Sequence, residues 1–282
     1  MRPAPPATNE HLAGGPLDGA GVEGRAARGL SGLWVRAASR HLVRSLHFPA
    51  GVRVISIGGA TFGGSGKTPL ALACAAEIAA SGLRVVLVGH AYRARPRGAR
   101  LVGESDALDE VGDEALLAAR ALARLHPDGR ARVVVAPNRA QAIALAAHYA
   151  DVLVLDGVAQ TRPAPSALAL LAVDAAEPWG RASRMPPNGD LRAPVAALLF
   201  ASDAVVAVGD PDVGSPVRGA FQAHVLSEGV RLGGRHLNWA DLRGARVGLI
   251  SALARPERVV RALARRGVTL QALLAARDHG PF

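Results

Sequence analysis

Short apolar runs alternate with Ala- and Leu-rich stretches along the first half of the chain. The runs at 52–59, 83–90, 131–137 and 150–157 are rich in Val, Ile and Leu, which predicts strands buried on both faces. The stretches between them, at 69–81, 113–125 and 138–149, have the apolar spacing of helices. This alternation predicts an α/β fold in which a parallel sheet carries helices on both faces.

A second set of apolar runs follows residue 160, after a segment with two prolines at 161–168 (TRPAPSAL). The runs at 168–175, 202–209 and 245–253 predict further strands. We therefore expect one domain over 49–160 and a second, smaller α/β domain over 161–282.

A glycine-rich loop, GGATFGGSGKTP at 58–69, follows the first predicted strand and precedes the first predicted helix. Glycines let the backbone N–H groups turn inward around an anion, and the helix N-terminus adds a partial positive charge. Lys67, the only lysine in the sequence, would reach the β- and γ-phosphates of ATP, and the Thr68 hydroxyl would hold Mg²⁺. The strict P-loop pattern requires glycine at position 61, which is Thr61 here. The predicted nucleotide-binding residues are Gly63, Gly64, Ser65, Gly66, Lys67 and Thr68.

Asp156 stands at the end of the apolar run at 150–157. An aspartate at the carboxyl end of a strand parallel to the P-loop strand can hold Mg²⁺ directly or through water. By itself such an aspartate is also typical of a turn or a helix cap. Beside a P-loop the metal interpretation is favoured, so Thr68 and Asp156 are the predicted metal ligands.

The N-terminal part of the chain has two characters. Residues 1–29 are rich in Pro, Gly and Ala and predict a disordered tail. At 30–48, Leu, Trp and Ala gather on one side of a helix, while Arg36, Arg40 and Arg44 form a basic face. This pattern predicts a helix that lies on an anionic membrane, or alternatively a surface helix that packs on its own domain. No stretch approaches the about 18 to 20 apolar residues of a spanning helix.

The formal net charge of +10 comes mainly from arginine and indicates an anionic partner. Phosphate, nucleic acid and an acidic membrane surface all meet that description. Aromatic residues make up only 4% of the chain and the arginines are scattered, except at 93–100. Because base stacking needs aromatic side chains, we do not expect a nucleic-acid partner. We expect a monomer.

Seven segments, in this order and at these spacings, resemble the tetraacyldisaccharide 4'-kinases of lipid A synthesis over about residues 30–282. They are GGATFGGSGKTP, VGDEALLAAR, VVVAPNRAQA, ADVLVLDGVAQ, MPPNGDLRAP, ASDAVVAV and ARPERVVRALARRGV with the final DHGPF. The resemblance implies transfer of the γ-phosphate of ATP, with Mg²⁺, to the 4'-hydroxyl of a tetraacylated glucosamine disaccharide 1-phosphate. It also implies a peripheral enzyme at the cytoplasmic face of the bacterial inner membrane, and it favours membrane contact for 30–48.

The resemblance assigns further site residues. Its GDE motif falls on Gly112, Asp113 and Glu114, and its D-H motif falls on Asp278 and His279. It implies that Asp113 and His279 act as a pair that draws the proton from the attacking hydroxyl, with Lys67 as the third catalytic residue. Without it, Asp113 is an acidic residue at a helix start and His279 a solvated surface residue. The implied substrate contacts are Gln160, Asn188 and Arg192.

Several positions depart from the family pattern. Gly157 replaces the second aspartate of the family's D-D-G-x-Q, and GHAY at 89–92 replaces S-R-G-Y. The chain ends at DHGPF, where relatives run on for several dozen residues. Losing a carboxylate from a magnesium site weakens the field around the phosphates, so we expect slow turnover. The alternatives to an active kinase are a lipid-binding relative with little activity and a P-loop ATPase of the partitioning or maturation type.

Overall fold

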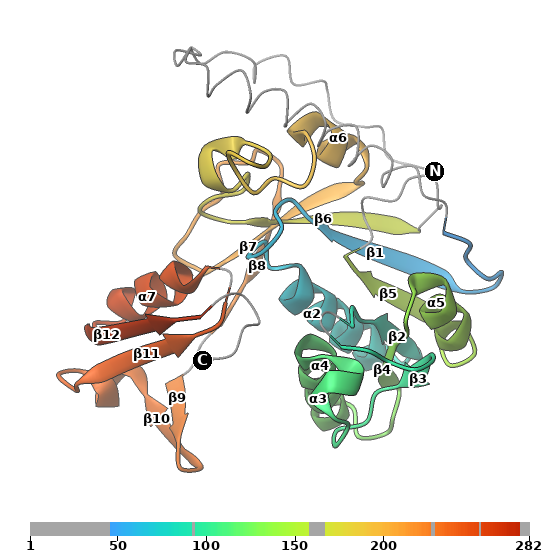
Figure 1. Cartoon of the computed structure of the whole chain (residues 1–282), viewed down its shortest axis with the longest axis horizontal. Helices are drawn as coiled ribbons and strands as arrows, with labels where there is room; N and C mark the ends of the chain where they lie inside the picture. The colour runs from blue at the N-terminus through green and yellow to red at the C-terminus, as the bar shows by residue number, and fades with distance from the viewer. Residues whose placement is uncertain (1–45, 92–93, 158–166, 227–228, 254, 277–282) are drawn as a thin grey trace.

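The computed structural model describes residues 46–91, 94–157, 167–226, 229–253 and 255–276 (Figure 1). Eight of the described strands form one sheet in the spatial order β3-β4-β2-β5-β1-β6-β7-β8. All neighbouring strands are parallel except β3, which pairs antiparallel to β4 at one edge. The strands are β1 (Arg53–Gly59), β2 (Val85–Val88), β3 (Arg100–Leu101), β4 (Ala131–Val135), β5 (Val152–Asp156), β6 (Leu168–Asp174), β7 (Ala204–Gly209) and β8 (Phe221–His224).

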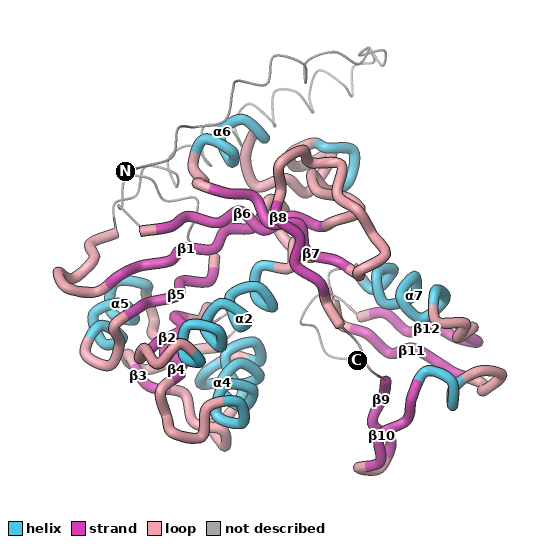
Figure 2. Tube along the Cα trace, turned by 180° about the vertical axis from the view of Figure 1, so that it is seen from behind, coloured by secondary structure: helices cyan, strands magenta, loops and turns pink. Residues whose placement is uncertain are grey.

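Helices cover both faces of this sheet, as its buried strands predict (Figure 2). On one face, α2 (Lys67–Ala80) and α4 (Asp113–Leu125) pack against side chains such as Ile57, Leu87 and Val154. On the other, α5 (Arg139–Ala147) packs against Val86 and Leu153, and α6 (Val195–Phe200) lies in the neighbouring cluster of β6 and β7. The short helix α3 (Leu108–Val111) precedes α4.

The strand order reverses at β1, which lies between β5 and β6. In open α/β sheets, ligands bind outside the carboxyl ends of the strands at such a reversal. The loop at 60–66 leaves β1 at this edge, and Asp156 at the end of β5 is the register partner of Ile57 in β1. The fold therefore brings two of the predicted functional segments to the same point.

The main sheet continues past the domain boundary expected between residues 160 and 161. β6 pairs with β1, β7 with β6 and β8 with β7, so all three belong to the sheet of the P-loop strand. A change of composition along the chain shows where a connection lies, but not whether the next strand joins the same sheet. The break in architecture comes after β8.

A smaller lobe follows β8, and Figure 1 shows it beside the main sheet. It contains the parallel pair β11 (Val247–Ser251) and β12 (Leu270–Ala275), with α7 (Pro256–Arg265) between them in the chain. A hairpin of β9 (Gly229–Leu232) and β10 (Arg235–Asn238) precedes this pair. Two short 3-10 turns lie at η1 (Arg181–Ser183), between β6 and α6, and η2 (Trp239–Leu242), after β10.

The predicted disordered tail and almost all of the predicted membrane helix lie outside the described residues. Of the helix, only 46–48 are described; they have no regular structure, and Leu46 and Phe48 pack against the cluster that α5 covers. In the part of the chain that the structure describes, no helix combines the length and apolar character needed to cross a membrane.

Candidate active site

The loop between β1 and α2 has the shape of an anion cradle. Gly64 and Gly66 have φ values of 71° and 80°, which side-chain-bearing residues rarely adopt. The α2 helix begins at Lys67, directly after this turn. A Cβ on Gly59 would lie 2.2 Å from the Ser65 Oγ, so the chain needs glycine there to let the loop fold back onto β1.

Thr61 occupies the position at which the strict P-loop pattern requires glycine. Its Oγ1 donates a hydrogen bond of 2.7 Å to the Gly63 carbonyl, and its backbone forms an isolated bridge with Leu191. The φ of Thr61 is not positive, so its backbone conformation does not require glycine. The close approach between the loop and β1 is at Gly59 instead. The departure from the motif is therefore accommodated locally.

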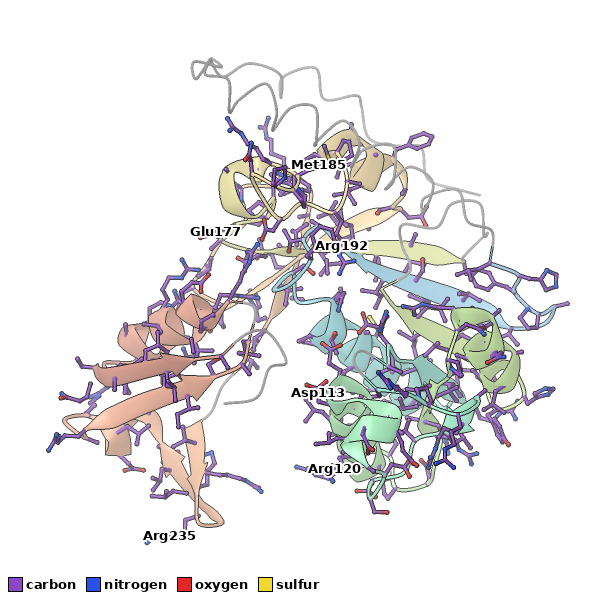
Figure 3. The ribbon with its side chains drawn as sticks, viewed as in Figure 1. Asp113, Arg120, Glu177, Met185, Arg192 and Arg235 are labelled. Carbon is purple, nitrogen blue, oxygen red and sulfur yellow. The ribbon has the colours of Figure 1, made fainter. Side chains whose placement is uncertain are left out.

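Arg192 contacts the same loop from the segment that precedes α6. Its Nε donates to the Thr61 carbonyl at 2.7 Å and its Nη2 to the Phe62 carbonyl at 3.1 Å. The guanidinium also lies 5.1 Å from the centre of the Phe62 ring. Figure 3 shows Arg192 beside the loop. These contacts hold the P-loop, and the predicted contact of Arg192 with the substrate stays a prediction.

The hydroxyl of Thr68 is the centre of a polar cluster. It lies 2.8 Å from Asp156 Oδ2 and 3.1 Å from Glu114 Oε1, with hydrogen-bond geometry to both. Lys67 Nζ lies 3.8 Å from Asp156 Oδ1. Asp156 is buried, and its Oδ1 has no hydrogen-bond partner among the described residues. The arrangement joins the end of β5, the start of α2 and the start of α4.

The composition of this cluster suits a magnesium ion. A hydroxyl and two carboxylates offer only oxygen donors, which Mg²⁺ prefers. The buried, unsatisfied Oδ1 of Asp156 leaves an acceptor that a cation would satisfy. Within the described ranges, no group of three or more His, Cys, Asp or Glu side chains forms another metal site.

Glu114 is the member of this cluster that the sequence interpretation did not assign. The signal was present, because Glu114 follows Asp113 in the GDE motif. Gly112, with φ 86°, makes the turn between α3 and α4 and directs the start of α4 toward the P-loop. Asp113 itself is exposed at that helix start, and its Oδ1 accepts the backbone N–H of Glu114 at 2.8 Å (Figure 3).

Cationic groups surround Asp156 at this edge. Desolvation lowers the pKa of Arg139 to about 10, although Asp156 opposes this, so the guanidinium stays charged near neutral pH. Desolvation also lowers the pKa of Arg192, again against the attraction of Asp156. At His90, partial desolvation lowers the pKa, and the positive charges of Arg139 and Lys67 lower it further. The edge therefore has an excess of positive charge, which favours an anionic ligand.

The remaining predicted residues are not brought into this cluster. Gln160 and His279 lie outside the described residues, so their predicted roles stay predictions. Asn188 is exposed in the turn after η1, where its backbone N–H donates to the Met185 carbonyl at 3.2 Å. Figure 3 places Met185 on the far side of Arg192 from Asp113.

Comparison with known proteins decides the family. The model of the tetraacyldisaccharide-1-P 4'-kinase family matches residues 27–282. The chain belongs to this family. A tetraacyldisaccharide 4'-kinase of Anaeromyxobacter sp. (strain Fw109-5) is 36% identical, over 83% of this chain and 66% of the relative. That of Nitrobacter winogradskyi is 33% identical, over 89% of this chain and 72% of the relative.

The same family provides a structural neighbour. LpxK from Aquifex aeolicus, solved in complex with ATP, has a TM-score of 0.65 and 22% identity, covering 90% of this chain and 81% of its own. This likeness supports the P-loop α/β fold. As a member of the family, the chain is an ATP-dependent kinase of lipid A biosynthesis that phosphorylates an acylated disaccharide.

Proposed function

We propose that this chain transfers the γ-phosphate of ATP to the 4'-hydroxyl of a tetraacylated disaccharide 1-phosphate at an anionic membrane surface, through the residues around Thr68. The observation that carries the proposal is the convergence of Thr68, Asp156 and Glu114 beside Lys67. In phosphoryl transfer, the protein supplies mainly positioning and charge, and this cluster supplies both.

The nucleotide phosphates lie in the loop formed by Gly63, Gly64, Ser65 and Gly66, at the N-terminus of α2. Backbone N–H groups and the helix dipole favour their negative charge. Lys67 brings a compact ammonium to the terminal phosphates as charge moves onto the bridging oxygen. Arg192 supports this geometry through its two hydrogen bonds to the loop carbonyls.

Thr68, Asp156 and Glu114 would hold Mg²⁺ in this site. When bound there, the ion neutralises charge on the phosphate oxygens. Asp156 also holds Lys67 toward the site, since the two groups lie 3.8 Å apart. Glu114 comes from α4, so it links the nucleotide loop to the helix start that carries Asp113.

The acceptor hydroxyl requires a proton acceptor within hydrogen-bond reach. We assign this role to Asp113 with His279. The position of Asp113 supports the assignment, because its neighbour Glu114 reaches Thr68 while Asp113 itself is exposed to solvent. Gln160 and Asn188 are assigned to the disaccharide.

The membrane part of the proposal rests on the basic, apolar pattern at 30–48 and on the net charge of +10. These features favour peripheral attachment to an anionic leaflet, at the cytoplasmic face of the inner membrane. Deleting 30–48 should move the protein from the membrane to the soluble fraction at physiological salt. Unchanged fractionation would return this segment to a packing role.

The catalytic part is tested by incubating purified protein with labelled ATP and tetraacyldisaccharide 1-phosphate. We expect labelled lipid whose new phosphate is at the 4' position. ATP hydrolysis that does not respond to the lipid, with no labelled lipid, would instead favour an ATPase of the partitioning type.

A further inference from the structure

Four neighbouring strands direct polar residues to the same edge of the sheet. In spatial order, Arg139 follows β4, His90 follows β2, Asp156 ends β5 and Lys67 follows β1. Lys67 and Thr68 account for the contacts of Asp156 described above. Arg139 is the charged residue at this edge that those contacts do not use.

Arg139 is held in place but is not satisfied. It is the first residue of α5, where the side chain of Asn138 caps the helix by accepting the Gln141 backbone N–H at 3.0 Å. The Nη1 of Arg139 is buried and has no hydrogen-bond partner among the described residues. A buried guanidinium nitrogen without an acceptor is costly, so its retention in a defined position calls for a ligand.

Gly157 leaves room for this guanidinium. A Cβ on Gly157 would lie 3.3 Å from Arg139 Nη2, and the backbone there has φ 83°. An aspartate at this position, as in the family motif, would bring a carboxylate within reach of Arg139 and pair with it. With glycine, Asp156 is the acidic group that acts on Arg139, and it is already engaged by Thr68 and Lys67.

We propose that Arg139 binds an oxygen of the terminal phosphate of the nucleotide, as a second cation beside Lys67, and that Gly157 leaves the guanidinium open for this contact. The inference rests on the proposed function. The planar guanidinium suits a phosphate, to which it donates directed, charge-assisted hydrogen bonds. The phosphate would thus pair with Arg139 in the way that the carboxylate of an aspartate at position 157 would.

Metal-free binding isolates this contact. Calorimetric titration with ATP and with ADP in the presence of EDTA measures the contribution of the terminal phosphate. We expect Arg139→Gln to lower the affinity for ATP by about tenfold and to leave the affinity for ADP within about twofold, because only ATP carries the phosphate in question. Arg124→Gln, an exposed arginine in the last turn of α4, is the matched control and should leave both affinities unchanged.

Position 157 gives a second, independent test that keeps Arg139 intact. Gly157→Asp should lower metal-free ATP affinity several-fold relative to Gly157→Asn, since only the aspartate pairs with Arg139. Asp and Asn both tolerate the left-handed backbone conformation better than most residues. Comparing the Asp and Asn variants with each other therefore cancels the effect of backbone strain.

Two results would overturn the inference. One is an unchanged ratio of ATP to ADP affinity in Arg139→Gln, and the other is equal behaviour of the two position-157 variants. If the unchanged ratio comes with a raised KM for the acceptor, Arg139 is assigned to the acceptor's own phosphate instead. Each of these leaves the proposed function standing, whereas a wild-type protein that binds no ATP would remove the proposed function instead.

Discussion

The sheet around β1 and the small lobe of β11, β12 and α7 differ in how their strands are covered. Every residue of β2 and β5 is buried. In β12, five of six residues are exposed, including Leu273 and Leu274, which are 50% and 58% exposed. The main sheet is therefore stabilised by apolar burial on both faces, and the small lobe has much less burial of this kind.

Charged groups make the connection between the two regions. Arg255, which is 6% exposed, lies 2.6 Å from Asp190 through its Nη2 and makes longer ion pairs with Asp174 and Glu177. Arg258 donates to the Gly64 carbonyl at 2.6 Å and pairs with Asp174 at 2.9 Å. Arg258 lies in the first turn of α7, and Arg255 directly precedes the helix. The small lobe is thus attached to the nucleotide loop itself, so its position bears on the shape of the site.

The largest expected effect is at the buried sheet edge. Lys67→Ala and Lys67→Arg should each lower phosphoryl transfer by about a thousandfold or more, because a guanidinium is too broad for a loop closed around one ammonium. Steady-state assays measure the loss, and unchanged circular dichroism shows that the fold remains. Near wild-type activity in Lys67→Arg would contradict the role given to this lysine.

The proposed dyad should have the next largest effect. Asp113→Ala and His279→Ala should each reduce turnover by about a hundredfold, with ATP affinity nearly unchanged. The effects of substituting residues that act as a unit are not additive. The double variant should therefore have hardly lower turnover than the less active of the two single variants. Turnover of the four proteins with and without the acylated disaccharide tests this. Full activity in His279→Ala, or losses that multiply, would remove the dyad.

The charged attachment of the small lobe predicts a loss of stability. Arg255→Met removes the guanidinium that lies 2.6 Å from Asp190 and one of the two arginines paired with buried Asp174, and should lower the free energy of unfolding by about 3 kcal/mol. Arg261→Met removes a half-exposed partner that lies 3.4 Å from Glu177. This substitution should change the free energy of unfolding by less than about 1 kcal/mol. Urea denaturation compares the two. Equal effects would mean that burial of the ion pairs does not matter for holding the lobe.

The smallest effect concerns pH at the sheet edge. Desolvation and neighbouring cations lower the pKa of His90 below its ordinary value of 6.5 in the folded chain. As the pH falls below that value, the unfolded chain binds a proton there while the folded chain remains neutral, so the free energy of unfolding decreases. His90→Gln should show a shallower decrease than wild type in denaturation curves taken from pH 7.5 to 5.5. Parallel curves would show that His90 titrates normally.

The sequence was sufficient for the elements that rest on strong local patterns. Apolar runs located β1, β2, β4 and β5, and the glycine loop located the start of α2, because each depends on residues adjacent in the chain. The short edge strand β3 and the hairpin of β9 and β10 lack such runs, since none of their residues is buried. The membership of β6 to β8 in the main sheet depends on contacts between distant segments, which no local pattern records.

The site shows the same division. Lys67, Thr68 and Asp156 were predicted from motif and strand-end position, and the structure brings them together. The bond from Glu114 to Thr68 and the hold of Arg192 on the loop connect residues far apart in the chain. The space above Gly157 could not be predicted either, because it is defined by the side chain of Arg139 from another strand connection.

The balance between ATP consumed and lipid phosphorylated tests the central claim most directly. Purified protein is incubated with ATP and tetraacyldisaccharide 1-phosphate, and ADP and 4'-phosphorylated lipid are measured in the same samples. We expect equal amounts of the two products, and little ADP without the lipid, because the site positions the acceptor hydroxyl for the γ-phosphate. ADP formation without matching 4'-phosphate would contradict a lipid-sugar kinase and identify the cluster around Thr68 as the site of an ATPase.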